Sequence, residues 1–92
     1  MGMVRALPSG LEWWPVADSR SGNTVAWAYD PRSSNAYVIY AGRGIFTPYA
    51  YFGVSRETVD AVRASGYVSR AIAHLIKPHD CEPLAPIATL PF

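Results

Sequence analysis

The chain has 92 residues, of which half are apolar and 16% are charged. This length allows one domain with a thin core, and the composition excludes a disordered polyelectrolyte. The longest uninterrupted apolar run is far shorter than the ~18 residues that a membrane span needs, so we expect no membrane insertion. The net charge of +1 conceals an uneven distribution, because residues 31–77 carry six basic and two acidic side chains and the flanks are acidic.

Residues 1–23 predict an extended arm rather than a packed element. Prolines and glycines interrupt the apolar residues, which follow neither a period of 2 nor one of 3.6. A short strand is compatible with Leu11 to Trp14. Trp13 and Trp14 are adjacent, so in an extended arm the rings point in opposite directions and one of them can face a partner. The broken apolar pattern after Arg5 also predicts no signal peptide.

Three segments predict an antiparallel meander. "TVAWAYD" (24–30) alternates large and small side chains and "AYVIYA" (36–41) is rich in β-branched and aromatic residues, so each predicts a strand. The turn residues between them favour a hairpin, and a glycine turn then leads to a third extended segment at 45–52. Pro48 lacks the N–H that a ladder needs, which predicts a bulge or an unpaired edge there.

Two short helices are predicted after these strands. Ser55 is a good N-cap for the first, and a Ser-Gly pair at 65–66 ends or kinks it. The second, over about 67–77, has the clearest amphipathic pattern of the chain and stops at Pro78. Its expected buried stripe consists of Val68, Ala71, Ile72, Leu75 and Ile76.

Residues 78–92 predict a second apolar arm, rich in proline. The predicted fold class is therefore α+β: an antiparallel meander of three strands, or four with the N-terminal arm, two short helices packed on one face, and extended apolar terminal arms. The predicted organisation is an arm over 1–23, an α+β domain over 24–77 and an arm over 78–92. Such arms bury their side chains on their own domain or in a neighbour's groove. The candidate docking residues of the arms are Trp13, Trp14, Leu84, Ile87 and Phe92.

Several motifs in order resemble one known family. They are "YD" at 29–30, a following strand and glycine turn, "YAYFGV" at 49–54, a short helix, and "ASGYVSRAI" at 64–72. Together they are similar to the KTSC domain, a small module found at the C-terminus of some lysyl-tRNA synthetases and as a stand-alone protein in bacteria and phages. The resemblance covers roughly residues 25–77. It implies a small α+β module without known catalysis, for which the activity put forward is RNA binding.

Tyr49 and Tyr51 share one face of the third strand, opposite Phe52. If the helices cover the Phe52 side, the tyrosines belong to an open aromatic face of the kind that stacks unpaired bases, and nearby basic residues add contacts to phosphate. The alternative is that the rings pack under the helices or an arm and keep their hydroxyls at the rim. The candidate binding residues are Tyr37, Tyr40, Arg43, Tyr49, Tyr51, Arg56 and Arg70.

The segment "HDCE" (79–82) holds an imidazole, a thiol and carboxylates, but it lacks a second ligand pair, so we predict no metal site. The residues next to Cys81 do not provide a general base that a third group could orient, so we expect no nucleophilic catalysis. The sequence contains neither a glycine-rich phosphate-binding loop nor the nucleophile elbow of hydrolases, so we expect no enzyme and no cofactor. Cys81 is the single cysteine and forms no internal disulfide, which favours a cytoplasmic protein or, as the alternative, a virion component.

These observations leave three candidate functions in order of preference. The first is a non-catalytic binding module that engages a macromolecule, with RNA as the leading candidate, through the aromatic sheet face. The second is a phage structural protein whose apolar arms dock on neighbouring protein subunits. The third is a protein that sequesters a small phosphorylated ligand through Arg43, Arg56 and Tyr49.

Overall fold

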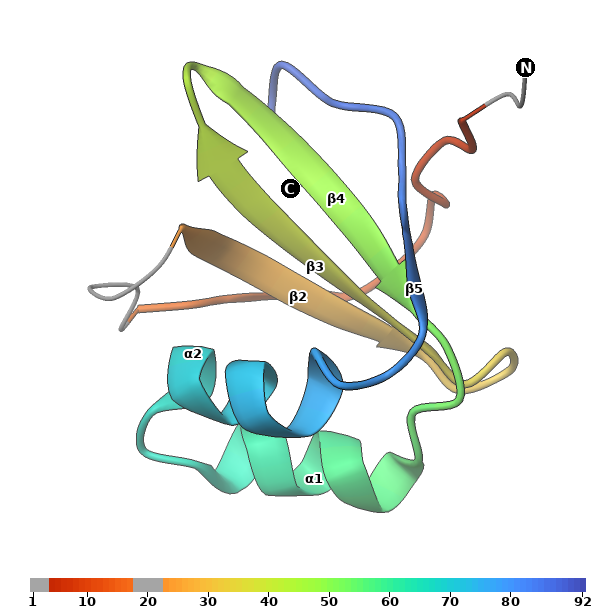
Figure 1. The fold of residues 1–92 in the computed structure, drawn as a ribbon, viewed down its shortest axis with the longest axis vertical. Coiled ribbons are helices and arrows are strands. Elements are labelled where there is room, and N and C mark those ends of the chain that lie inside the picture. Colours follow the sequence, from red (N-terminus) through yellow and green to blue (C-terminus); the bar gives the residue numbers. More distant parts are fainter. Residues whose placement is uncertain (1–3, 18–22) are drawn as a thin grey trace.

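A computed structural model describes residues 4–17 and 23–92, which form one five-stranded sheet with helices on one face (Figure 1). Neighbouring strands are antiparallel, and their order in the sheet follows the chain. The α+β class and the meander are confirmed, whereas the three or four expected strands are five. Residues 1–3 and 18–22 of the predicted N-terminal arm lie outside the described residues. The strands are β1 (Trp13–Pro15), β2 (Thr24–Asp30), β3 (Asn35–Gly42), β4 (Ile45–Tyr51) and β5 (Cys81–Pro83).

Two hairpins form the centre of the sheet. In the β2–β3 loop, the Asp30 carboxylate accepts a hydrogen bond from the Arg32 amide at 3.0 Å, and this bond holds the pKa of Asp30 below its ordinary value. The Asp30 carbonyl accepts a second bond, from the Ser34 amide at 2.9 Å. In the β3–β4 turn, Arg43 and Gly44 have φ values of 54° and 76°, which is the left-handed pair that a two-residue type I′ turn requires.

The helix layer consists of α1 (Arg56–Ala64), α2 (Val68–Ala71) and η2 (Ile72–Ile76). Ser55 caps α1 as predicted, because its hydroxyl accepts a hydrogen bond from the Thr58 amide at 3.1 Å. η2 continues α2 as a π-helical turn, in which the Lys77 amide donates to the Ile72 carbonyl. Within the described ranges, none of the helices has the length and apolar content that crossing a membrane requires.

The π-helical turn changes which side chains of the second helix face the sheet. Ile72 and Ile76 are fully buried, but Leu75, which the amphipathic pattern placed in the buried stripe, is 40% exposed. A π turn holds more residues than an α turn, so the positions within it are rotated relative to the 3.6-residue pattern. This rotation accounts for the outward position of Leu75.

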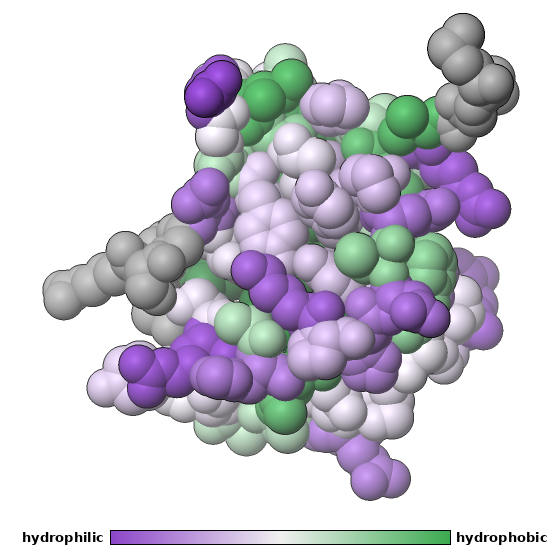
Figure 2. Space-filling model, viewed as in Figure 1, coloured by the Kyte–Doolittle hydropathy of each residue, from purple (hydrophilic) through white to green (hydrophobic). Residues whose placement is uncertain are grey.

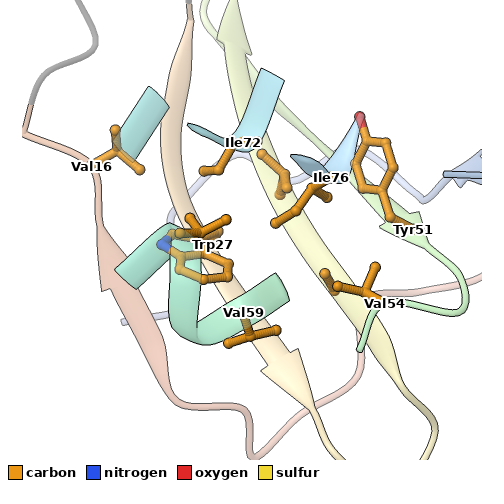
Figure 3. Close-up of a cluster of buried hydrophobic side chains, with 10 residues drawn as sticks. Val16, Trp27, Tyr51, Val54, Val59, Ile72 and Ile76 are labelled. Carbon is orange, nitrogen blue, oxygen red and sulfur yellow. The ribbon is translucent and has the colours of Figure 1, made fainter. Parts of the chain in front are cut away.

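The main core lies between the helix layer and the sheet and is built around Trp27. This side chain of β2 is 1% exposed. Figure 3 shows its indole facing Val59 of α1, with Ile72 and Ile76 descending from the second helix onto the same sheet face. The other buried members of this cluster are Val16, Ala36, Val38, Tyr51, Val54 and Val62.

Described residues from the N-terminal and C-terminal segments cover the opposite face of the sheet. Tyr37 and Ala50 project to that face, and Leu84, which is 3% exposed, packs with them. The Ala85 amide donates to the Arg5 carbonyl at 2.8 Å, so the two ends also contact each other. The described parts of the predicted arms are therefore packed on their own chain, and two of their segments are the edge strands β1 and β5. Partly buried side chains in this second cluster are Leu7, Leu11, Trp13 and Phe52.

Pro48 lies inside the sheet, not at a bulge or an unpaired edge. Strand β4 has β3 on one side and β5 on the other, and Pro48 stands opposite Ile39. Its carbonyl accepts a hydrogen bond from the Leu84 amide at 2.8 Å. The N–H and C=O of one residue point to the same side of an antiparallel strand. The N–H that proline lacks would therefore face the β5 side, so proline removes no bond between β4 and β3.

Replacing Arg43 by asparagine is expected to stabilise the β3–β4 hairpin by about 1 kcal/mol, because the left-handed backbone conformation is costly for arginine and tolerated by asparagine. Urea unfolding of the two proteins measures the difference. Arg43→Lys serves as the control, since lysine keeps the same backbone cost and should leave the unfolding midpoint unchanged. Equal midpoints for Arg43→Asn and the original chain would show that this turn carries no backbone strain.

Candidate functional site

The four candidate tyrosines of the sheet lie on two different faces. Tyr40, Tyr49 and Tyr51 belong to the helix-side face, whereas Tyr37 packs on the opposite face with Leu84. The expectation of one aromatic face around all four residues is therefore wrong for Tyr37. The physical reason is the strand period of 2, which sends positions 37 and 40 of β3 to opposite faces.

The helices cover the Tyr51 side of the sheet and not the Phe52 side, which is the second of the two arrangements that the sequence left open. Tyr51 is 4% exposed, and its hydroxyl oxygen lies 2.9 Å from that of Tyr40. Burial is the main cause that raises the pKa of both phenols, followed for Tyr40 by the bond to Tyr51. Both hydroxyls therefore remain protonated at neutral pH and act as hydrogen-bonding groups, not as phenolates.

Tyr40 and Tyr49 remain half-exposed at the end of the helix layer. Their ring centroids are 5.6 Å apart in an edge-to-face arrangement, and the Lys77 ammonium lies 5.3 Å from the centroid of the Tyr40 ring. We call these three residues the tyrosine ledge. Figure 2 shows weakly hydrophilic groups in front of β3 and β4, bordered by a strongly hydrophilic band along the helix layer. The ledge thus combines aromatic surface with a cation.

Lys77 was absent from the sequence-based candidate residues, although a signal for it existed. It follows the buried Ile76 directly, at the end of the second helix. Lys77 is the residue at which η2 ends, so its side chain lies at the edge of the helix layer, next to the sheet. Its contact with Tyr40 depends on how the helix packs on β3, which the helical periodicity alone does not specify.

The three predicted basic residues form no cation–π contact with the tyrosines of the ledge. Arg43 is exposed at the tip of the β3–β4 turn. Arg70 places its guanidinium 5.7 Å from the ring centroid of Tyr67 on the outer side of the helix layer. Arg56 begins α1, and its Nε lies 3.6 Å from a carboxylate oxygen of Asp60. The cation that contacts a tyrosine of the ledge is therefore Lys77 and none of these arginines.

A pocket of about 190 Å³ lies between α1 and the β1–β2 edge of the sheet. The helix contributes Arg56, Val59 and Arg63 to its lining. The remaining lining residues, from β1, β2 and the adjoining chain, are Glu12, Trp14, Tyr29 and Pro31. Neither Arg43 nor Tyr49 lines this pocket, so the trio expected to hold a small phosphorylated ligand is not assembled there.

The docking residues predicted in the arms contact their own chain. Trp13 and Trp14 point to opposite faces, as expected for neighbours in an extended segment. The ring centroids of Trp13 and Phe92 are 6.4 Å apart in a stacked arrangement. The ring centroids of Trp14 and Trp27 are 4.7 Å apart. Ile87 forms an antiparallel bridge with Phe46 of β4. Phe92 keeps 59% of its surface exposed and is the arm residue most accessible to another molecule among the five predicted.

The "HDCE" segment is held by backbone contacts to the end of β4. The His79 ring Nδ1 lies 3.1 Å from the Phe52 carbonyl, and the Phe52 amide donates to the Asp80 carbonyl at 2.8 Å. Cys81 is exposed in β5. In the part of the chain that the structure describes, no three His, Cys, Asp or Glu side chains come together as a metal site.

Comparison of the chain with protein-family models, with curated proteins and with solved structures finds no match.

Proposed function

We propose that the chain is a non-catalytic binding module, similar to KTSC domains, that engages single-stranded RNA through the tyrosine ledge. The observation that carries this proposal is the position of the Lys77 ammonium, 5.3 Å from the centroid of the Tyr40 ring, which in turn packs edge-to-face with the half-exposed Tyr49. Aromatic rings stack unpaired bases and a neighbouring cation contacts the phosphate, which is the combination that binds single strands without sequence preference.

The charge distribution supports this proposal. Residues 31–77 carry a net charge of +4, from six basic and two acidic side chains. Among the described residues, the ion pairs are formed by Arg5, Arg32 and Arg56, so Lys77 has no carboxylate partner in that part of the chain. An ammonium without such a partner is available to neutralise a phosphate.

The test measures binding of a short fluorescein-labelled oligouridine by anisotropy at low and high salt. The variant is Tyr49→Leu with Lys77→Gln, which removes one aromatic ring and the cation while keeping apolar volume under the helices. Loss of one base stack alone is expected to weaken binding roughly 5- to 150-fold. Loss of one phosphate contact should also lower the slope of log affinity against log salt by about 0.7.

The matched control is Tyr67→Leu with Arg32→Gln. It makes a comparable pair of changes at exposed positions, since Tyr67 is 66% exposed and Arg32 lies in the β2–β3 loop. This control should bind RNA as the original chain does. If the ledge variant unfolds at the original temperature and binds with unchanged affinity, or if the original chain binds no single strand at low salt, the proposal is wrong.

The candidate function through docking arms has less support from the packing. Leu84 is buried on the chain's own sheet and Trp13 packs in the same cluster, so these side chains would have to leave their sites before they could enter a neighbour's groove. Phe92 is the exposed residue on which this candidate depends.

A further inference from the structure

The pocket between α1 and the β1–β2 edge carries two arginines on one side of one helix. Arg56 and Arg63 are seven residues apart in α1, which is close to two full turns, so both guanidinium groups reach the same side. The facing wall contains the aromatic side chains Trp14 and Tyr29. This site is separate from the tyrosine ledge, and none of its lining residues belongs to the ledge.

Arg63 lies over the ring of an aromatic side chain. Its guanidinium carbon lies 4.5 Å from the centroid of the Trp14 ring. The ring centroids of Trp14 and the buried Trp27 are 4.7 Å apart. An arginine stacked on an aromatic face keeps its in-plane N–H groups free for a planar, two-pronged interaction. Within residues 4–17 and 23–92, no carboxylate forms an ion pair with Arg63. Its donors are therefore oriented in advance and available to a ligand.

Arg56 adds a second cation that a ligand can recruit. Its only ion-pair partner in the described chain is Asp60, at 3.6 Å, and both side chains are more than half exposed. Pairs of this kind contribute little to stability, so the guanidinium can turn to a stronger anion at small cost. Arg56 is also the first residue of α1, where the helix dipole favours negative charge.

The size and lining of the pocket limit the ligand. Its volume of about 190 Å³ is below the roughly 300–1,000 Å³ of sites that enclose a drug-sized molecule. The pocket therefore accepts one anionic group and a small part of what carries it. Glu12 also lines the pocket. Its carboxylate repels any anion, and because this repulsion grows with the charge of the anion, it disfavours a polyphosphate more than a single phosphate.

We propose that this pocket, with Arg56 and Arg63 as the ligating side chains, binds a single phosphate group, supplied either as free phosphate or by a small monophosphorylated ligand. Two guanidinium forks match the tetrahedral arrangement of phosphate oxygens. Trp14 positions Arg63 and lines the same pocket. The proposal does not depend on RNA binding at the ledge.

The test titrates the full chain with inorganic phosphate, adenosine monophosphate and adenosine while NMR follows the Trp14 indole N–H and the Arg63 side-chain N–H signals. Phosphate and adenosine monophosphate are expected to shift both signals saturably, and adenosine is expected to leave them in place. Tighter binding of the nucleotide would identify a phosphorylated small molecule as the source, and equal binding would identify free phosphate. Saturable shifts with adenosine, or none with the two phosphates, would overturn the proposal.

Arg63→Gln is expected to weaken phosphate binding roughly 10- to 150-fold, which is the range for hydrogen bonds to charged groups. Arg63→Lys keeps the charge but loses the planar fork, so an intermediate affinity is expected. The matched control is Arg70→Gln, since Arg70 also lies over an aromatic ring but outside the pocket. Retained affinity in Arg63→Gln would contradict the proposal. The ledge variant Tyr49→Leu with Lys77→Gln should bind phosphate normally, which separates this result from any result with RNA.

Discussion

A chain that ends at residue 80 is expected to lose most of its stability. Strand β5 pairs with β4 through residues 81–83, and Leu84 is a buried member of the second core cluster. Loss of the Leu84 side chain alone is expected to cost about 2–5 kcal/mol. Loss of the β5 hydrogen bonds adds about 0.5–1.5 kcal/mol for each. Since a domain of this size has ~5–15 kcal/mol in total, the shortened chain should be largely unfolded or unfold at much lower urea.

Circular dichroism during urea unfolding measures this effect, and removal of Phe92 alone is the matched control. Phe92 is 59% exposed, and its ring centroid lies 6.4 Å from that of Trp13. Its removal should therefore lower the free energy of unfolding by no more than about 1 kcal/mol. If the chain ending at residue 80 unfolds at the same urea concentration as the full chain, the C-terminal segment does not stabilise the sheet. That result would favour its use as an arm that docks on other subunits.

Trp27→Ala is expected to destabilise the protein by about 3–5 kcal/mol, because it removes the largest fully buried side chain and leaves a cavity between β2 and the helix layer. Trp27→Phe should cost less, since it retains an aromatic ring in the same site. Thermal and urea unfolding measure both changes. The substitution should also loosen Trp14, which contacts Trp27 and carries Arg63 on its ring.

The control for Trp27→Ala is Tyr67→Ala, which removes an aromatic ring that is 66% exposed and should change stability by no more than about 0.5 kcal/mol. Equal destabilisation by the two substitutions would show that Trp27 is not the centre of the core. Reduced phosphate binding in a folded Trp27→Phe variant would further indicate that the core sets the position of Arg63.

The central strands and the helix start could be predicted because local patterns determine them. The alternation around Trp27 specified a strand, and Ser55, as an N-cap, specified where the first helix begins. Strand β5 could not be predicted in the same way, since a three-residue segment ending in Pro83 has no period of its own. It becomes a strand because the edge of β4 offers hydrogen-bonding groups and Leu84 fills a site beside Tyr37.

The sequence pattern likewise could not predict which face of the sheet the helices cover. Strand β4 carries aromatic side chains on both faces, with Tyr51 on one and Phe52 following on the other. A period of 2 identifies the two sets but not the set that the helices cover. The tyrosine ledge arises from the packing of η2 near Tyr40, and the arginine pocket from the packing of α1 against β1. The seven-residue spacing of Arg56 and Arg63 is a local signal for the pocket, because it puts both side chains on one side of α1.

Pro48 has a consequence for the behaviour of this protein when its C-terminal segment detaches. The outer edge of β4 would then be exposed to other chains, and uncovered edges are the usual starting points of strand-to-strand aggregation. Because the missing N–H of Pro48 lies on that edge, the row of donors is interrupted in the middle of the strand. A foreign strand would find only short stretches on either side of the proline to pair with. We therefore expect Pro48 to limit strand-to-strand association through this edge of β4.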